Sequence, residues 1–185
     1  MSLEQSTIEE FKKESLGLMK ELNSVVENLE RPSKEFPGAL LEEFSQKIDR
    51  IMGTVKTLAI SEPEHRGLRA IGSISEICKH MGYKAAVAQV TTLIPLYAAF
   101  WLDSLEVLQD FINTVDDESR TTQQGRSFAP ILQKRLEWLN QKTEAATQGK
   151  PEAAKAGSTP YSGKAPSGKL LSQAEIDKLL ADLGR

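Results

Sequence analysis

Hydrophobic residues recur at steps of three, four and seven through most of residues 1–148, which is the spacing of one helix face. Breaks at Arg31-Pro32 and at Ser61-Glu62-Pro63 end the first two predicted helices, because proline disfavours helical geometry in the residue before it. Ser6 and Glu9 have the spacing of a capping box at the start of the first helix. The apolar positions of these two helices are Phe11, Leu18, Leu22, Val25 and Leu29, then Leu41, Phe44, Ile48, Ile51, Val55 and Leu58.

Three further helices are predicted before residue 149. The third ends at Gly82, and the fourth runs from Tyr83 to Val115 with a kink or a division at Pro95. A polar stretch from Asp116 to Arg126 separates it from a last helix that begins near Pro130. No segment alternates with a period of two, so the predicted fold is all-α: an elongated, four-helix-bundle-like assembly. Long helices in a chain of this size often complete their core with a second copy, and we expect a homodimer.

The composition changes at Gly149. Residues 149–169 contain four glycines, three prolines, four lysines and no large aliphatic residue, which predicts a flexible linker. Residues 170–185 then form a short amphipathic helix in which Ser172 and Glu175 make a capping box. Its single apolar face consists of Ile176, Leu179, Leu180 and Leu183. Such a helix either packs back on its own bundle (residues 1–148) or docks on a partner, and the preceding linker favours docking.

Composition and charge exclude several classes of function. The chain of 185 residues has a net charge of −3, which gives no general attraction to nucleic acid or to an anionic membrane surface. Cys78, His65 and His80 are too few for a disulfide or for most zinc sites, and we expect no metal and no cofactor of the protein's own. The uncharged stretch from Ala85 to Leu102 contains polar residues and a proline, which favours a buried bundle helix over a membrane insertion. The charged N-terminus lacks the apolar run of a secretory signal, so a cytoplasmic location is expected.

The tail carries a family resemblance. The string LSQAEIDKLL at residues 171–180 is similar to the N-terminal peptide by which the flagellar switch protein FliM captures phosphorylated CheY. Extended to residue 184, it resembles the C-terminal peptide of the CheZ family of chemotaxis phosphatases. The resemblance implies docking on a phosphorylated CheY-like response regulator, which would supply its own Mg²⁺. The implied receiver-binding residues are Ser172, Gln173, Ile176, Asp177, Leu179, Leu180, Leu183 and Gly184.

The CheZ family also implies a dimeric bundle with phosphatase activity. Its signature is an Asp followed four positions later by a Gln, which orients the attacking water, and this sequence has no such pair. The nearest candidates are Gln123 and Gln124, although Arg120 stands four residues before Gln124. Other phosphatases of the same regulator use an acid and an Asn three residues later. The pairs Asp110 with Asn113 and Glu137 with Asn140 have that spacing.

Two alternatives to a phosphatase stay open. A noncatalytic adaptor or phosphate-sink protein of the chemotaxis and flagellar switch system would need only the bundle and the docking tail. A histidine-phosphotransfer bundle would need an exposed histidine followed three residues later by lysine. Leu68 and Tyr83 occupy those positions after His65 and His80, which disfavours phosphotransfer.

Overall fold

The computed structural model describes residues 5–148 and 170–183, and helices dominate both ranges. The elements are α1 (Gln5–Glu30), α2 (Gly38–Ser61), α3 (Arg66–Ala88), the 3-10 turn η1 (Thr91–Leu93), α4 (Ile94–Asn113), α5 (Glu118–Thr147) and α6 (Gln173–Leu183). No strand occurs in these two ranges, which confirms the all-α prediction.

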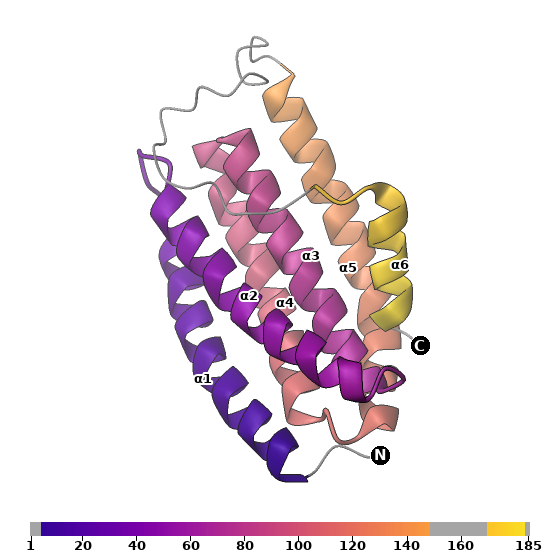
Figure 1. Ribbon diagram of the computed structural model, residues 1–185. Helices are drawn as coiled ribbons and strands as arrows, with labels where there is room; N and C mark the ends of the chain where they lie inside the picture. Colours follow the sequence, from indigo (N-terminus) through magenta and orange to yellow (C-terminus); the bar gives the residue numbers. More distant parts are fainter. Residues whose placement is uncertain (1–4, 149–169, 184–185) are drawn as a thin grey trace.

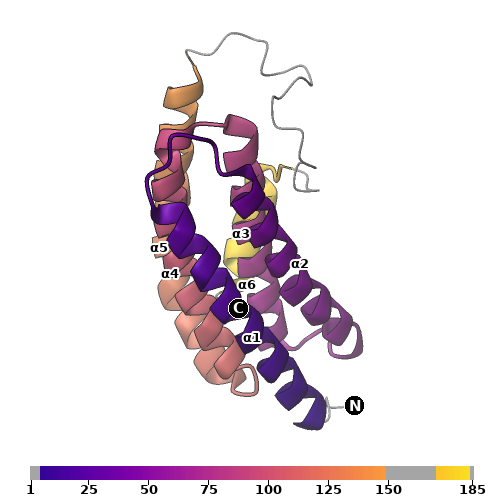
Figure 2. The ribbon, with the colours of Figure 1, turned by 90° about the vertical axis from the view of Figure 1, so that its left-hand side faces the viewer.

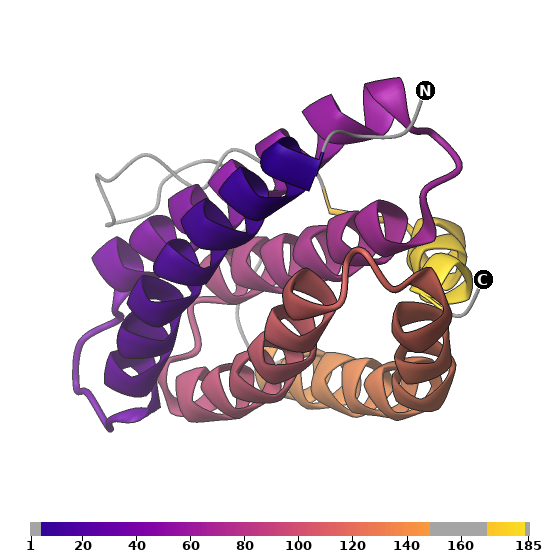
Figure 3. The ribbon, with the colours of Figure 1, turned by 90° about the horizontal axis from the view of Figure 1, so that it is seen from below.

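The first four helices form an up-and-down bundle in which α1 packs on α2 and α4, and α3 packs on the same two helices (Figure 1). The fifth helix covers α3 and α4 from outside, and α6 lies along α3 and α5. Viewed along the bundle, α6 sits on the opposite side from α1 (Figure 3). The expected four-helix bundle is therefore present and is extended by two helices on one side.

An aromatic cluster holds the centre of the core. Trp101 of α4 packs on Phe44 of α2 and on Tyr97, with ring centroids 4.6 Å and 5.8 Å away. The indole nitrogen of Trp101 donates to the carbonyl oxygen of Cys78 on α3 at 3.2 Å, and the Tyr97 hydroxyl lies 2.7 Å from that of Thr143 on α5. Burial raises the pKa of the Cys78 thiol to about 12, as suits an inert core residue.

The boundary between the third and fourth helices differs from the prediction. The third helix continues through Gly82 to Ala88. A Cβ at Gly82 would lie 3.3 Å from the Ser45 hydroxyl oxygen on α2, which is a tight contact. This glycine therefore serves close helix packing and does not end the helix. Gln89, in a left-handed conformation with φ of 48°, ends α3 instead.

Prolines and caps account for the other differences. Pro95 lies in the first turn of α4, where its missing N–H is not needed. The last bundle helix begins at Glu118, so most of the predicted polar connection is helical and Pro130 lies inside α5. Since Gln5 is already helical, Ser6 is not a cap, and Glu9 instead accepts a hydrogen bond from the Gln5 side chain. Among the described helices, none has the length and apolarity that a membrane span requires.

Candidate functional site

The C-terminal helix begins where the sequence predicts. The Ser172 backbone N–H and hydroxyl both donate to the Glu175 carboxylate at 2.7 Å, and the Glu175 N–H donates to the Ser172 hydroxyl oxygen at 3.3 Å. These bonds satisfy backbone donors that a helix start leaves unpaired, and they confirm the capping box. Gln173 and Asp177 are joined by a further side-chain hydrogen bond of 2.8 Å on the exposed side of α6.

The apolar face of α6 is covered by the protein's own bundle. Ile176, Leu180 and Leu183 are 5%, 7% and 1% exposed against α3 and α5, and Leu179 is half-buried. This is the first of the two arrangements that the sequence allowed for the tail. The polar candidates Ser172, Gln173 and Asp177 face solvent, and Gly184 lies outside the described residues.

Two specific contacts hold the ends of this segment. A Cβ built on Gly125 of α5 would overlap the carbonyl oxygen of Leu183 and lie 2.7 Å from its carbonyl carbon, so only glycine allows this approach. At the other end, the Leu171 N–H donates to Nδ1 of His80 on α3 at 3.0 Å. Sequence analysis identified neither partner, because a lone glycine in a polar stretch and a lone histidine carry no signal for a helix contact.

His80 is 5% exposed and is held in its neutral form. Burial lowers the pKa of His80, the nearby Lys84 lowers it further, and Glu175 acts in the opposite direction. The titratable and charged groups around it are Lys56 on α2, Glu76, Lys79, Tyr83 and Lys84 on α3, and Glu175 on α6, with Glu144 of α5 acting on Lys84. Only a neutral imidazole can accept a hydrogen bond from Leu171.

The attachment of α6 is therefore expected to weaken in acid. Because the folded-state pKa of His80 lies below its ordinary value of about 6.5, the contribution is complete above that pH and is lost as pH falls through the lowered pKa. The loss is that of one buried hydrogen bond, about 1 kcal/mol. Amide exchange of α6, corrected for the intrinsic effect of pH, should show it. In His80→Phe, the increase of α6 amide exchange in acid should be absent. If the variant keeps the pH profile of the intact protein, His80 is not the group responsible.

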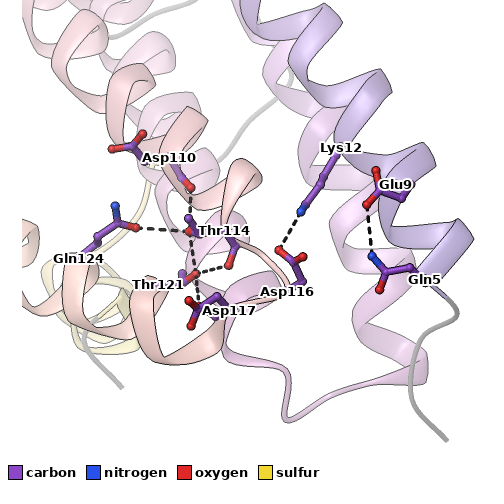
Figure 4. Close-up of polar contacts among 9 residues, drawn as sticks. All are labelled: Gln5, Glu9, Lys12, Asp110, Thr114, Asp116, Asp117, Thr121 and Gln124. Carbon is purple, nitrogen blue, oxygen red and sulfur yellow. Dashed lines mark hydrogen bonds and ion pairs between the residues drawn. The ribbon is translucent and has the colours of Figure 1, made fainter.

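The two glutamines named from the sequence lie on α5, and the structure brings them beside an acid from α4. Asp110, Gln123 and Gln124 line one shallow hollow of about 390 Å³ between these helices. Its remaining walls are Val107, Ser127, Phe128 and Ile131. Figure 4 shows the Gln124 amide and the Asp110 carboxylate on the same side of the helix pair. The acid and the amide thus line one hollow from two helices, where the CheZ signature has both on one helix.

A threonine network places Gln124 on this side. Asp117 caps α5 by accepting from the Arg120 N–H at 3.0 Å, and the Thr121 hydroxyl donates to the Thr114 carbonyl at 2.8 Å. The Thr114 hydroxyl donates to the backbone carbonyl oxygen of Asp110 at 2.8 Å and also lies 3.4 Å from the Gln124 side-chain oxygen (Figure 4). These bonds fix the start of α5 against the end of α4. Sequence analysis missed them, although Asp117 before an acidic first turn is a usable helix-start signal.

The start of α5 is also tied to the first helix. Lys12 and Asp116 form an ion pair of 2.7 Å, and the Lys12 hydrogen bond is the main reason why the pKa of Asp116 lies below its usual value (Figure 4). Asp116 lies in the connection between α4 and α5, so the pair anchors the end of the bundle that carries the hollow.

The acid and asparagine pairs do not form comparable sites. Asn113 is the last residue of α4 and does not line the hollow that Asp110 shares with the glutamines. Asn140 accepts a 2.7 Å hydrogen bond from Lys84 of α3, whereas Glu137 is exposed and accepts from Gln133. The Glu137 and Asn140 side chains therefore have separate partners.

Comparisons with known proteins add no relative: no family model, no curated protein and no solved structure matches this chain. Within the described ranges, no group of three or more His, Cys, Asp or Glu side chains is arranged to hold a metal ion. The features of the described residues that bear on function are therefore α6 and the hollow between α4 and α5.

Proposed function

We propose that this protein binds a phosphorylated CheY-like response regulator through α6 and promotes its dephosphorylation. The observation that carries the proposal is α6 itself, an eleven-residue helix that has its own cap and one apolar face. Residues 171–180 resemble the CheY-binding peptide of FliM, and the longer string that ends at Gly184 resembles that of CheZ, both in polar residues and in apolar spacing. A helix of this kind docks by placing its apolar side chains in a partner's groove.

The hollow between α4 and α5 suits the proposed reaction. Hydrolysis of an aspartyl phosphate needs an aligned water, because the regulator supplies the metal and its own acidic cluster. In this proposal the amide of Gln124 orients the water and the Asp110 carboxylate contacts the regulator's active-site lysine. Gln123 is exposed at the rim of the same hollow and is the alternative source of the amide.

A noncatalytic adaptor is the second candidate. The observation in its favour is that Asp110 and Gln124 come from two helices, so the one-helix geometry of the CheZ signature is absent from this site. Phosphotransfer through His80 is disfavoured, since its ring is buried and its Nδ1 atom already accepts from Leu171.

The decisive experiment measures the lifetime of a CheY-type receiver phosphorylated by acetyl phosphate, with this protein added below stoichiometry. We expect faster decay with the intact chain. Gln124→Ala should slow the stimulated reaction about 10²-fold, the loss typical of a misplaced reactant, and leave binding unchanged. Gln141→Ala, an exposed glutamine on the same helix, is the matched control.

Thermal unfolding of both variants checks that loss of the contact between Gln124 and Thr114 does not disturb the bundle. Binding without any acceleration would establish the adaptor. If no CheY-type receiver binds, the proposal is wrong in both forms.

A further inference from the structure

We infer that α6 has two mutually exclusive binding partners, the surface between α3 and α5 of its own bundle and the regulator, and that closure on the bundle limits regulator binding. This inference rests on the proposed function and adds its regulation. We call the observed arrangement the closed state.

Both partners need the same side chains. Ile176, Leu180 and Leu183 are nearly inaccessible in the closed state, and they are the apolar anchors that a docking helix presents. A helix of eleven residues with one apolar face cannot bury that face in two places. The regulator can therefore bind only after α6 has left the bundle.

The surface between α3 and α5 is shaped to receive α6. Gly125 lets the α6 backbone approach at Leu183, and His80 accepts a hydrogen bond from Leu171 just before the helix begins. These contacts lie at opposite ends of the segment, so they fix both its depth and its position along the bundle. They are contacts of a defined bound state and not of a loosely attached tail.

The closed state can open without unfolding the bundle. The largest fully buried side chains are Trp101, Tyr97, Phe44, Phe111, Met19, Leu22, Leu29, Leu41, Ile48, Ile51, Leu68 and Ile71. All of them belong to α1–α4, and Figure 2 shows α6 on the far side of the bundle behind α3. Release of α6 thus leaves the central core intact, and such peripheral elements open at a lower cost than global unfolding.

The effect on affinity follows from the open fraction. When only the open state binds, the observed dissociation constant is the intrinsic one divided by that fraction. A closed state favoured a hundredfold would weaken binding about a hundredfold, and any change that opens α6 should strengthen binding in proportion.

Gly125→Ala is the sharpest test, because the added methyl group would occupy the position of the Leu183 carbonyl. Gly53→Ala is its matched control: Gly53 is also inside a helix, and a Cβ there meets nothing within 4 Å. Hydrogen exchange without regulator should show faster exchange of α6 amides in Gly125→Ala and unchanged exchange in α1–α4. His80→Phe, which removes the other contact, is the second opening variant.

Affinity for a phosphorylated CheY-type receiver is then compared among the intact chain, the variants and a synthetic peptide of residues 170–185. We expect the peptide and Gly125→Ala to bind at least about tenfold more tightly than the intact chain and Gly53→Ala. His80→Phe, which loses one hydrogen bond, should bind about fivefold more tightly, and both gains should follow the opening measured by exchange. Equal affinities, with α6 opened in the variants, would overturn the inference and leave the proposed function standing. If the peptide itself binds no receiver, the proposed function fails, and the inference fails with it.

Discussion

Trp101→Ala is expected to lower the free energy of unfolding by about 3–5 kcal/mol, the range for removing a large aromatic side chain from a packed core. Trp101 is fully buried, contacts Phe44 and Tyr97, and bonds to the Cys78 carbonyl. The substitution leaves a cavity among α2, α3 and α4 and removes the additional hydrogen bond that Trp101 donates to the Cys78 carbonyl.

Urea unfolding followed by circular dichroism measures this loss, and Trp138→Ala is the matched control. Trp138 is 47% exposed on α5, with the Lys142 ammonium 5.7 Å from its ring centroid. That substitution should cost at most about 1 kcal/mol, the value of an exposed cation–π contact. Equal losses in the two variants would mean that the aromatic cluster is not the centre of the core.

The sequence predicted a helix end correctly where a proline or a capping residue lies at that end. The breaks at Pro32 and Pro63 and the cap at Ser172 meet this condition, and α1, α2 and α6 have the predicted limits at those points. Gly82 and Pro130 are common at helix ends but lie inside helices here. Gly82 is retained for close packing on α2, a tertiary requirement that local sequence does not reveal.

The pairing of Asp110 with Gln124 was not predictable from spacing. The CheZ signature has an acid and an amide on one helix, whereas these two residues come from α4 and α5 and line the same hollow. Their approach depends on the Thr114 and Thr121 bonds and on the Asp117 cap. Apart from Asp117, which has the sequence signal of a helix cap, these residues carry no signal of the contact, so only the three-dimensional arrangement shows that Asp110 and Gln124 line one hollow.

The sequence likewise did not determine which surface covers the apolar face of α6. Periodicity shows that a helix has an apolar face, but its partner can be any complementary surface. The linker composition favoured a partner, and the structure shows the bundle in that place. The resemblance to CheY-binding peptides and the observed packing concern the same apolar face, so the proposed receiver-bound state would compete with the closed state.

Leu180→Asp is expected to lower receiver affinity by about 10²–10³-fold or more, because a carboxylate would enter the apolar contact and lose its hydration there. Titration of the phosphorylated receiver with the intact chain and the variant measures the change. Ala181→Asp is the matched control, since it adds the same charge at the next, exposed position of α6.

Whether Leu180→Asp raises or lowers receiver affinity also distinguishes the contact of Leu180 with the bundle from its proposed contact with the receiver. Leu180 is buried in the closed state, so the substitution opens α6 and by that route alone would strengthen receiver binding. A net loss of affinity can then come only from a direct contact of Leu180 with the receiver. A synthetic peptide of residues 170–185 has no closed state, so in that peptide Leu180→Asp changes only the direct contact. Unchanged receiver affinity of the substituted peptide would mean that the apolar face serves the bundle alone, and receiver docking through α6 would have to be abandoned.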